Sequence, residues 1–290
     1  MEINFELYGG KVKGKFLGPT EEKPNRHMYY VNGERVSGAT TFLGIKDKSV
    51  ALVSYSKEQT IKHLLPTLSK SGTVTEEQLV QALYEDDRNT KAAADLGSAI
   101  HDWIEKYINH RLSKKNAMPE MPEDENILTG VTSFLDWESA HKVKFLWSEK
   151  VLYSRKHDYI GKADFGAVVD GKVCLCDIKT GNGMYNSVRA QTAAYAMADT
   201  EESKTKYDGR WAIRIAKETK AEYLERMKLK NRIREVLKKD PQPVDEYKTF
   251  EAVFLDEDKN SMKQDFSAFL AHVELYRWDQ KTDFWKAKQK

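Results

Sequence analysis

Two strand-like segments meet at a two-residue turn near the middle of the chain, and this hairpin constrains the fold more than any other feature. The segments ADFGAVV and KVCLCDIK are rich in apolar residues and flank Asp170-Gly171, a dipeptide typical of tight hairpin turns. If these two residues form the turn, Val169 pairs with Lys172 and each further pair follows by counting. Asp164 then lies directly opposite Asp177 on the same face of the sheet.

Two carboxylates in this arrangement repel each other, so their placement needs a cause. Their Cβ atoms are expected to be roughly 4.5–5.5 Å apart. The protein can tolerate the repulsion, raise the pKa of one carboxyl, or bind a cation, and a hard divalent ion held by carboxylates and a carbonyl fits best. Lys179 lies two residues beyond Asp177 and shares its face. Its ammonium can orient a water and stabilise negative charge on a phosphate. A D-x-K tripeptide that is seen alone is more commonly an ordinary salt bridge at a strand end.

Two further pairs of polar residues have helical spacing. Gln191 and Tyr195 are four residues apart on one predicted helix, where they can hydrogen-bond to phosphate or base edges or form an ordinary polar flank. His101 and Glu105 have the same spacing on an earlier helix. A histidine beside an apolar stripe is commonly a core residue, but this spacing also allows His101 to be a third metal ligand.

The pattern of apolar residues changes along the chain. The first 45 residues contain short strands with an Asn32-Gly33 hairpin signal, and helical segments follow, including one that begins with a T-x-x-Q capping box at Thr75 and another over 90–112. After Lys142 the apolar period shifts towards that of strands. We therefore expect an α/β protein with a helical N-terminal lobe over 1–142, which contributes His101, and an α/β core over 143–290.

Composition excludes several classes of protein and site. Two cysteines, Cys174 and Cys176, cannot supply the four thiolates of an iron–sulfur cluster, and we expect them to be small core residues in a reducing cytosol. No apolar run approaches the ~18 residues of a membrane span, so no membrane association is expected. The net charge is only +2, but residues 217–239 hold nine Lys or Arg against four Glu. That segment is a solvated helix face or a surface for phosphates.

Four short motifs follow one another within about residues 95–197: G-x-x-x-H-x-x-x-E, G-x-x-D, D-x-K-T and Q-x-x-x-Y. Their residues are Gly97, His101, Glu105, Gly161, Asp164, Asp177, Lys179, Thr180, Gln191 and Tyr195. This order resembles the PD-(D/E)XK nuclease superfamily, and within it the RecB-like exonucleases that include phage exonucleases and the mitochondrial genome maintenance exonuclease. The resemblance implies a restriction-endonuclease-like core, which is a mixed central β-sheet flanked by helices, and a metal-dependent DNA exonuclease.

The resemblance also implies roles for individual residues. Asp164, Asp177 and the carbonyl of Ile178 would hold Mg²⁺ or Mn²⁺, with His101 as a further ligand, and Lys179 would position the attacking water. The supporting or DNA-contacting positions would be Glu105, Thr180, Gln191 and Tyr195. Glu149 matches an acidic position of some members, with a surface salt bridge as an equal alternative. Asp177 stands where Glu is commoner, and the cysteines of the iron–sulfur members are absent.

The implied biology is DNA recombination, repair or replication in the cytoplasm, which would be the host cytoplasm for a phage-encoded protein. DNA is the expected partner, with single strands or strand ends favoured, and a recombination or replication protein can be a second partner. Two alternatives stay open. One is a structure-specific endonuclease of the same fold, and the other is a catalytically inactive nucleic-acid-binding module.

Overall fold

The protein is an α/β structure with two sheets and seven helices among the described residues. The computed structural model describes residues 1–23, 26–46, 49–181 and 183–281. The strands are β1 (Glu2–Leu7), β2 (Val12–Leu17), β3 (Met28–Val31), β4 (Glu34–Val36), β5 (Val143–Ser154), β6 (Tyr159–Val169), β7 (Lys172–Lys179), β8 (Gly209–Ile215) and β9 (Phe250–Phe254). The helices are α1 (Ala39–Leu43), α2 (Ser49–Ser71), α3 (Glu76–Leu112), α4 (Glu125–Ala140), α5 (Asn186–Ser203), α6 (Lys220–Val236) and α7 (Ser261–Lys281).

The N-terminal lobe is built on a β-sheet, so the prediction of a helical lobe is wrong. Strands β1 to β4 form an antiparallel sheet in sequence order, which we call sheet A, and β3 turns into β4 at the predicted Asn32-Gly33. Both turn residues have positive φ, as a tight hairpin requires. Sheet A packs over Ile160 at the start of β6. Its strands are visible in the sequence, but the longer helical segments that follow dominate the pattern.

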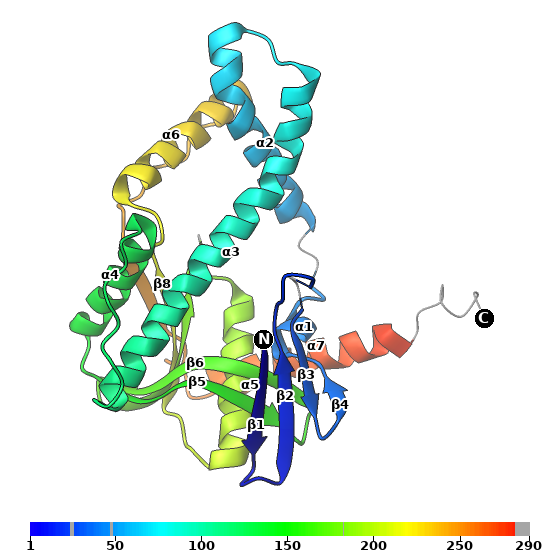
Figure 1. The fold of residues 1–290 in the computed structure, drawn as a ribbon, viewed down its shortest axis with the longest axis vertical. Coiled ribbons are helices and arrows are strands. Elements are labelled where there is room, and N and C mark those ends of the chain that lie inside the picture. The colour runs from blue at the N-terminus through cyan, green and yellow to red at the C-terminus, as the bar shows by residue number, and fades with distance from the viewer. Residues whose placement is uncertain (24–25, 47–48, 182, 282–290) are drawn as a thin grey trace.

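Helix α3 is a single helix of 37 residues, whereas the sequence predicted two. It begins at the predicted capping box, in which Oγ1 of Thr75 accepts a hydrogen bond from the Gln78 backbone N–H and Oε1 of Gln78 accepts one from the Thr75 N–H. No proline interrupts it, and at 1.5 Å per residue it is about 55 Å long. Its C-terminal half packs on the core, while its N-terminal half extends away from the sheet with α2 alongside (Figure 1).

The five-stranded sheet has the order β5-β6-β7-β8-β9 and is mixed, because only β7 and β8 are parallel. The predicted hairpin is confirmed: Asp170 and Gly171 have positive φ, and Val169 pairs with Lys172. The chain returns from β7 to the parallel strand β8 through α5. A helical crossover of this kind is the usual connection between parallel neighbours.

Helices cover both faces of the five-stranded sheet, and each face has its own apolar core. Ile100 and Ile104 of α3 and Phe134 of α4 are fully or almost fully buried against one face. On the other face α5 and α7 pack with α1, and Phe269 of α7 lies under Tyr159 of β6 (Figure 1). The predicted apolar stripe on α3 is therefore buried in the core. Its burial places the residues that flank the stripe beside the sheet.

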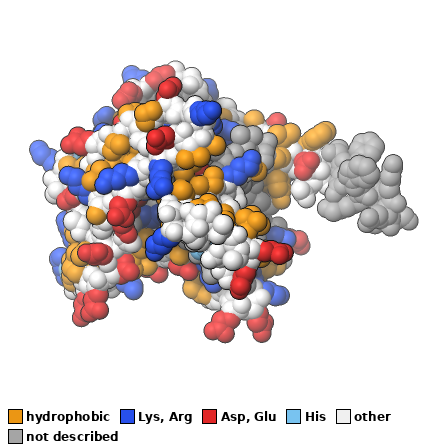
Figure 2. Space-filling view, turned by 90° about the horizontal axis from the view of Figure 1, so that it is seen from above, with side chains coloured by type: hydrophobic (Ala, Val, Ile, Leu, Met, Phe, Trp, Pro, Cys, Tyr) orange, Lys and Arg blue, Asp and Glu red, His pale blue; other side chains and the backbone are white. Residues whose placement is uncertain are grey.

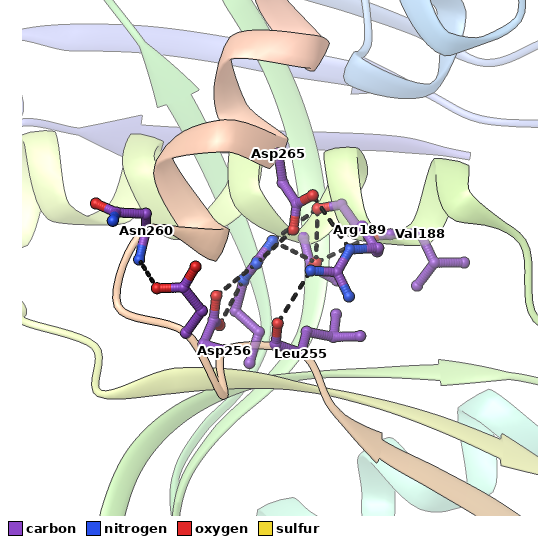
Figure 3. Close-up of polar contacts among 9 residues, drawn as sticks. Val188, Arg189, Leu255, Asp256, Asn260 and Asp265 are labelled. Atoms are coloured by element: carbon purple, nitrogen blue, oxygen red, sulfur yellow. Dashed lines mark hydrogen bonds and ion pairs between the residues drawn. The ribbon is translucent and has the colours of Figure 1, made fainter.

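A buried polar network fixes α5 and α7 to β8. Arg210 of β8 is fully buried and binds Asp256 through two nitrogens, at 2.6 and 2.8 Å, and Asp265 through one at 2.7 Å. Arg189 of α5 donates to the same Asp265 and to the carbonyl of Leu255 (Figure 3). Two guanidinium groups and two carboxylates neutralise one another, which makes their burial tolerable. The network therefore sets the position of α5 relative to the sheet.

Among the described residues, no helix combines the length and apolarity needed to cross a bilayer. The division of the chain near residue 142 stays a prediction.

Candidate metal centre

Three carboxylates lie side by side across three neighbouring strands. The residues on either side of Glu149 in β5 pair with those on either side of Asp164 in β6, so Glu149 lies opposite Asp164 in register. The ladder between β6 and β7 ends one position short of Asp164 and Asp177, which are opposite in the same register. The register predicted from the hairpin is correct. Asp164 is therefore the central carboxylate of a row of three.

Helix α3 brings a histidine to this row. A Cβ atom on Gly97 would lie 2.7 Å from Oγ1 of Thr180, so only glycine lets the helix approach the end of β7 this closely. One turn later, Nδ1 of His101 lies 3.7 Å from Oδ1 of Asp164. The side chains of His101 and Asp164 are 26% and 18% exposed, which leaves both accessible to solvent. The close approach of α3 thus adds an imidazole nitrogen to the carboxylates.

His101, Glu149 and Asp164 form a compact group of metal-ligand type. Each offers one ligand atom, and these atoms lie within 4.8 Å of one another. That spacing allows one cation to contact all three. Asp177, which the sequence predicted as a ligand, is not part of this group. The structure therefore brings two of the predicted ligands, His101 and Asp164, together with Glu149, and the role of Asp177 as a ligand stays a prediction.

Glu149 has an unusual backbone. Its φ is +50°, a left-handed conformation that non-glycine residues adopt rarely and at a cost of roughly 1–3 kcal/mol. Its carboxylate pairs with Lys162 of β6. Burial, reinforced by the charge of Asp164, raises the pKa of Glu149 to about 7. The sequence left Glu149 undecided because neither its backbone conformation nor its register could be deduced from the pattern of β5.

Asp177 is buried and paired with Lys179. It is 2% exposed, and Lys179 Nζ lies 2.6 Å from its Oδ2. Burial raises the pKa of Asp177; the charge of Lys179 lowers it, and that of Asp164 raises it. Burial lowers the pKa of Lys179, but the charges of Asp177 and Asp164 more than compensate, so the net shift is upward. Lys179 is therefore held as an ammonium beside Asp177.

His101, Glu149 and Asp164 line a cleft of about 380 Å³ between α3 and the sheet, whereas Asp177 and Lys179 lie outside its lining. Its walls include Gly97, His101, Glu149, Lys162, Asp164 and Thr180. Lys162 is not among the site residues predicted from the sequence. The only pattern that could have indicated it is the K-x-D spacing to Asp164, which puts both side chains on one face of β6. The cleft thus combines carboxylates, an imidazole and an ammonium, which suits a cation and an anionic ligand together.

The other predicted site residues lie around this cleft. The backbone N–H of Ile178 donates to Oδ2 of Asp164 at 2.6 Å, which orients the central carboxylate. The role of the Ile178 carbonyl as a ligand stays a prediction. Thr180 lines the cleft, whereas Glu105 is outside its lining and acts on Glu149 only through its charge.

Gln191 and Tyr195 lie on α5 and contact each other. Nε2 of Gln191 donates to the Tyr195 hydroxyl at 3.1 Å. Tyr195 is buried, and a Cβ on Gly161 would lie 2.4 Å from its ring, so the tyrosine packs directly under β6. A supporting role for these two residues, and contact between either of them and DNA, stay predictions.

The comparisons with known proteins add no relative: neither a scan of protein-family models nor a search of curated proteins finds a match to the chain.

We expect metal affinity at this centre to depend on pH. A cation binds the ionised carboxylate of Glu149, whose pKa is raised to about 7, so protons compete below that pH. The dissociation constant for Mn²⁺ should rise roughly tenfold when the pH falls from about 8 to about 6. Calorimetric titration across this range measures it. Glu149→Gln should bind more weakly and lose most of the dependence, and a wild-type affinity that is constant over the range would contradict the expectation.

Proposed function

We propose that the protein is a metal-dependent DNA exonuclease that hydrolyses phosphodiester bonds. One observation carries the proposal, namely the close grouping of His101, Glu149 and Asp164 beside the Asp177–Lys179 ion pair. Hydrolysis of a phosphodiester needs cation ligands and a positive group near the phosphate, and this grouping supplies both. The order of motifs that resembles PD-(D/E)XK nucleases supports the same activity.

The donor atoms fit a small divalent cation. Carboxylate oxygens suit Mg²⁺ and Mn²⁺, and an imidazole nitrogen favours Mn²⁺ of the two. Oε2 of Glu149 and Oδ2 of Asp177 are buried, and each is paired with a lysine, Lys162 and Lys179 respectively. A carboxylate has about four lone-pair sites, so one that pairs with a single ammonium can still bind a cation. When bound, the ion supplies a water of lowered pKa and neutralises charge on the phosphate.

The chain's own residues have separate tasks in this proposal. His101, Glu149 and Asp164 hold the cation, and the N–H of Ile178 fixes the orientation of Asp164. Lys179 acts as an ammonium and not as a base, because its raised pKa keeps it protonated. It donates hydrogen bonds to the attacking water or to a phosphate oxygen, where negative charge develops. The buried carboxylate of Asp177 keeps the ammonium in place.

Helices α2, α3 and α6 form an arch beyond the cleft (Figure 1). We propose that this arch contacts the DNA strand. Nη2 of Arg232 on α6 donates to the Ser69 hydroxyl on α2 at 3.1 Å. Nζ of Lys217, just before α6, donates to the Ala93 carbonyl on α3 at 3.1 Å. Ala93 also lines the cleft. The contacts connect the arch to the metal centre, so a strand bound under it would be led to the cation ligands.

We expect α6 to contribute phosphate contacts. On the end of the molecule that the arch forms, Lys and Arg side chains are mixed with apolar ones and with Asp and Glu (Figure 2). Reversing Lys228 and Lys230 to Glu should weaken DNA binding and flatten its dependence on salt, by roughly 0.7 in the logarithmic slope for each single-strand phosphate that is no longer neutralised. Fluorescence anisotropy with a labelled oligonucleotide, titrated at several salt concentrations in EDTA, measures both quantities.

The matched control reverses Lys259 and Lys263, which are exposed near the start of α7 and give the same change in net charge. This control should bind DNA nearly as the wild type does. Equal effects of the two double variants would show that α6 acts only through net charge and is a solvated face.

The proposed activity is tested with oligonucleotides labelled at the 5′ or the 3′ end and with circular single-stranded and supercoiled DNA. An exonuclease releases short products from the ends of linear strands in Mn²⁺ or Mg²⁺ and leaves circles intact. EDTA should stop the reaction. Cleavage of the circles would establish the endonuclease alternative, and binding without cleavage in either metal would establish the inactive module.

A further inference from the structure

A second cavity lies beside the metal centre, where sheet A meets the five-stranded sheet. Its volume is about 260 Å³, somewhat below the ~300–1,000 Å³ of sites that hold drug-sized ligands. Strands β1, β2 and β3 form one wall, β5, β6 and α5 form another, and the start of α1 completes the lining. A cavity of this size suits one planar ring system and not a larger ligand.

Aromatic side chains line this cavity from the side of sheet A. Phe16 and Tyr29 are cross-strand partners in β2 and β3, with ring centroids 4.9 Å apart. The ring of His27 lies 4.7 Å from that of Phe16 and 5.3 Å from that of Tyr29. Burial, and then the charge of Lys162, lower the pKa of His27 and favour its neutral ring. Two rings from sheet A, together with that of His27 just before β3, provide a surface on which a flat heterocycle can stack.

Lys162 connects this cavity to the metal centre. It lines both the aromatic cavity and the catalytic cleft, and its ammonium pairs with Glu149. Gly161, the residue before it, lies in the wall of the aromatic cavity, with Tyr195 packed against its Cα. The two cavities are thus neighbours on β6, and the ammonium group of Lys162 lies at their common boundary. A ligand with a negatively charged backbone and flat side groups matches this arrangement, because the backbone can pass Lys162 while a flat group enters the aromatic cavity.

We propose that the aromatic cavity binds one unpaired base of the DNA strand whose backbone occupies the catalytic cleft. This inference rests on the proposed nuclease function and narrows its substrate to DNA with at least one base that is free to leave the duplex. Stacking on Phe16, His27 and Tyr29 accepts any base, so the cavity selects for an unpaired state and not for sequence. Lys162 lies where the neighbouring phosphate would pass.

A thermodynamic cycle between one protein change and one DNA change tests the inference. Phe16→Leu removes the aromatic face but keeps an apolar side chain, and a series of oligonucleotides carries a single abasic site at successive positions. In metal-free buffer, one abasic position should weaken wild-type binding by roughly 5- to 150-fold, the range expected for loss of one stacked base. Phe16→Leu should weaken binding of the intact strand by a similar factor. For the strand that is abasic at that position, Phe16→Leu should cause almost no further loss of affinity.

Tyr30→Leu is the matched control, because Tyr30 is the neighbour of Tyr29 on β3 and lines a different cavity. It should bind every strand as the wild type does. His27→Ala, a change at an exposed residue, serves as a second test if Phe16→Leu lowers the melting temperature. The base site is overturned if the affinity losses from Phe16→Leu and from the abasic site add at every position. It is also overturned if every abasic strand binds the wild type as tightly as the intact strand does. Neither outcome touches the proposed nuclease activity. A wild type that neither binds nor cuts any strand overturns both.

Discussion

Replacing Asp164 by Asn is expected to abolish metal-dependent DNA cleavage. Asp164 is the central carboxylate of the row and one of three residues whose ligand atoms lie within 4.8 Å of one another. The amide keeps the shape and can still accept the hydrogen bond from the Ile178 N–H, but it removes the ligand charge. We expect the rate to fall on the order of 10³-fold or more, because stabilisation by the cation contributes several kcal/mol.

The matched control is Asp102→Asn, which changes an exposed carboxylate in the lining of the same cleft. It lies outside the group of three and should retain most of the activity. Binding of DNA to the Asp164→Asn protein in EDTA should be equal to or tighter than wild type, because one negative charge is removed. Wild-type cleavage by Asp164→Asn, measured in both Mg²⁺ and Mn²⁺, would remove this residue from the mechanism.

Replacing Arg210 by Met is expected to destabilise the folded protein strongly. Arg210 is fully buried and binds both Asp256 and Asp265, so its loss leaves two largely buried carboxylates without their main partner. Breaking a buried pair from one side costs about 3–5 kcal/mol. We expect the melting temperature to fall on the order of 10 °C, as measured by calorimetry.

Arg214 on the same strand provides the comparison. Its partner Glu251 is 44% exposed, and an ion pair of this kind contributes only about 0–1 kcal/mol. Arg214→Met should therefore melt within a few degrees of the wild type. Equal losses for the two variants would show that β8 tolerates removal of any arginine poorly and that the network of Figure 3 has no special weight.

Turn chemistry and local periodicity were the parts of the fold that the sequence could predict. Asp170-Gly171 and Asn32-Gly33 mark their hairpins because both turn positions need positive φ. From the first of these turns, the pairing of Asp164 with Asp177 follows by counting. Local capping chemistry likewise marked the start of α3 at Thr75.

The parts that could not be predicted depend on contacts distant in sequence or on backbone detail. The 46- and 55-residue separations between Arg210 and its two partners leave no local pattern. The left-handed backbone of Glu149, a residue that lies with His101 and Asp164, leaves none either. The extent of α3 was underestimated because a polar stretch without proline resembles a boundary between two helices.

The most direct test of the metal centre is to locate Mn²⁺ in crystals of the protein from its anomalous scattering. We expect a peak within coordination distance of His101, Glu149 and Asp164 together, with Asp177 close by and paired with Lys179. That peak should disappear in crystals of Asp164→Asn. A peak bound elsewhere, or none at a Mn²⁺ concentration that supports cleavage, would contradict the assignment of this cleft as the metal centre.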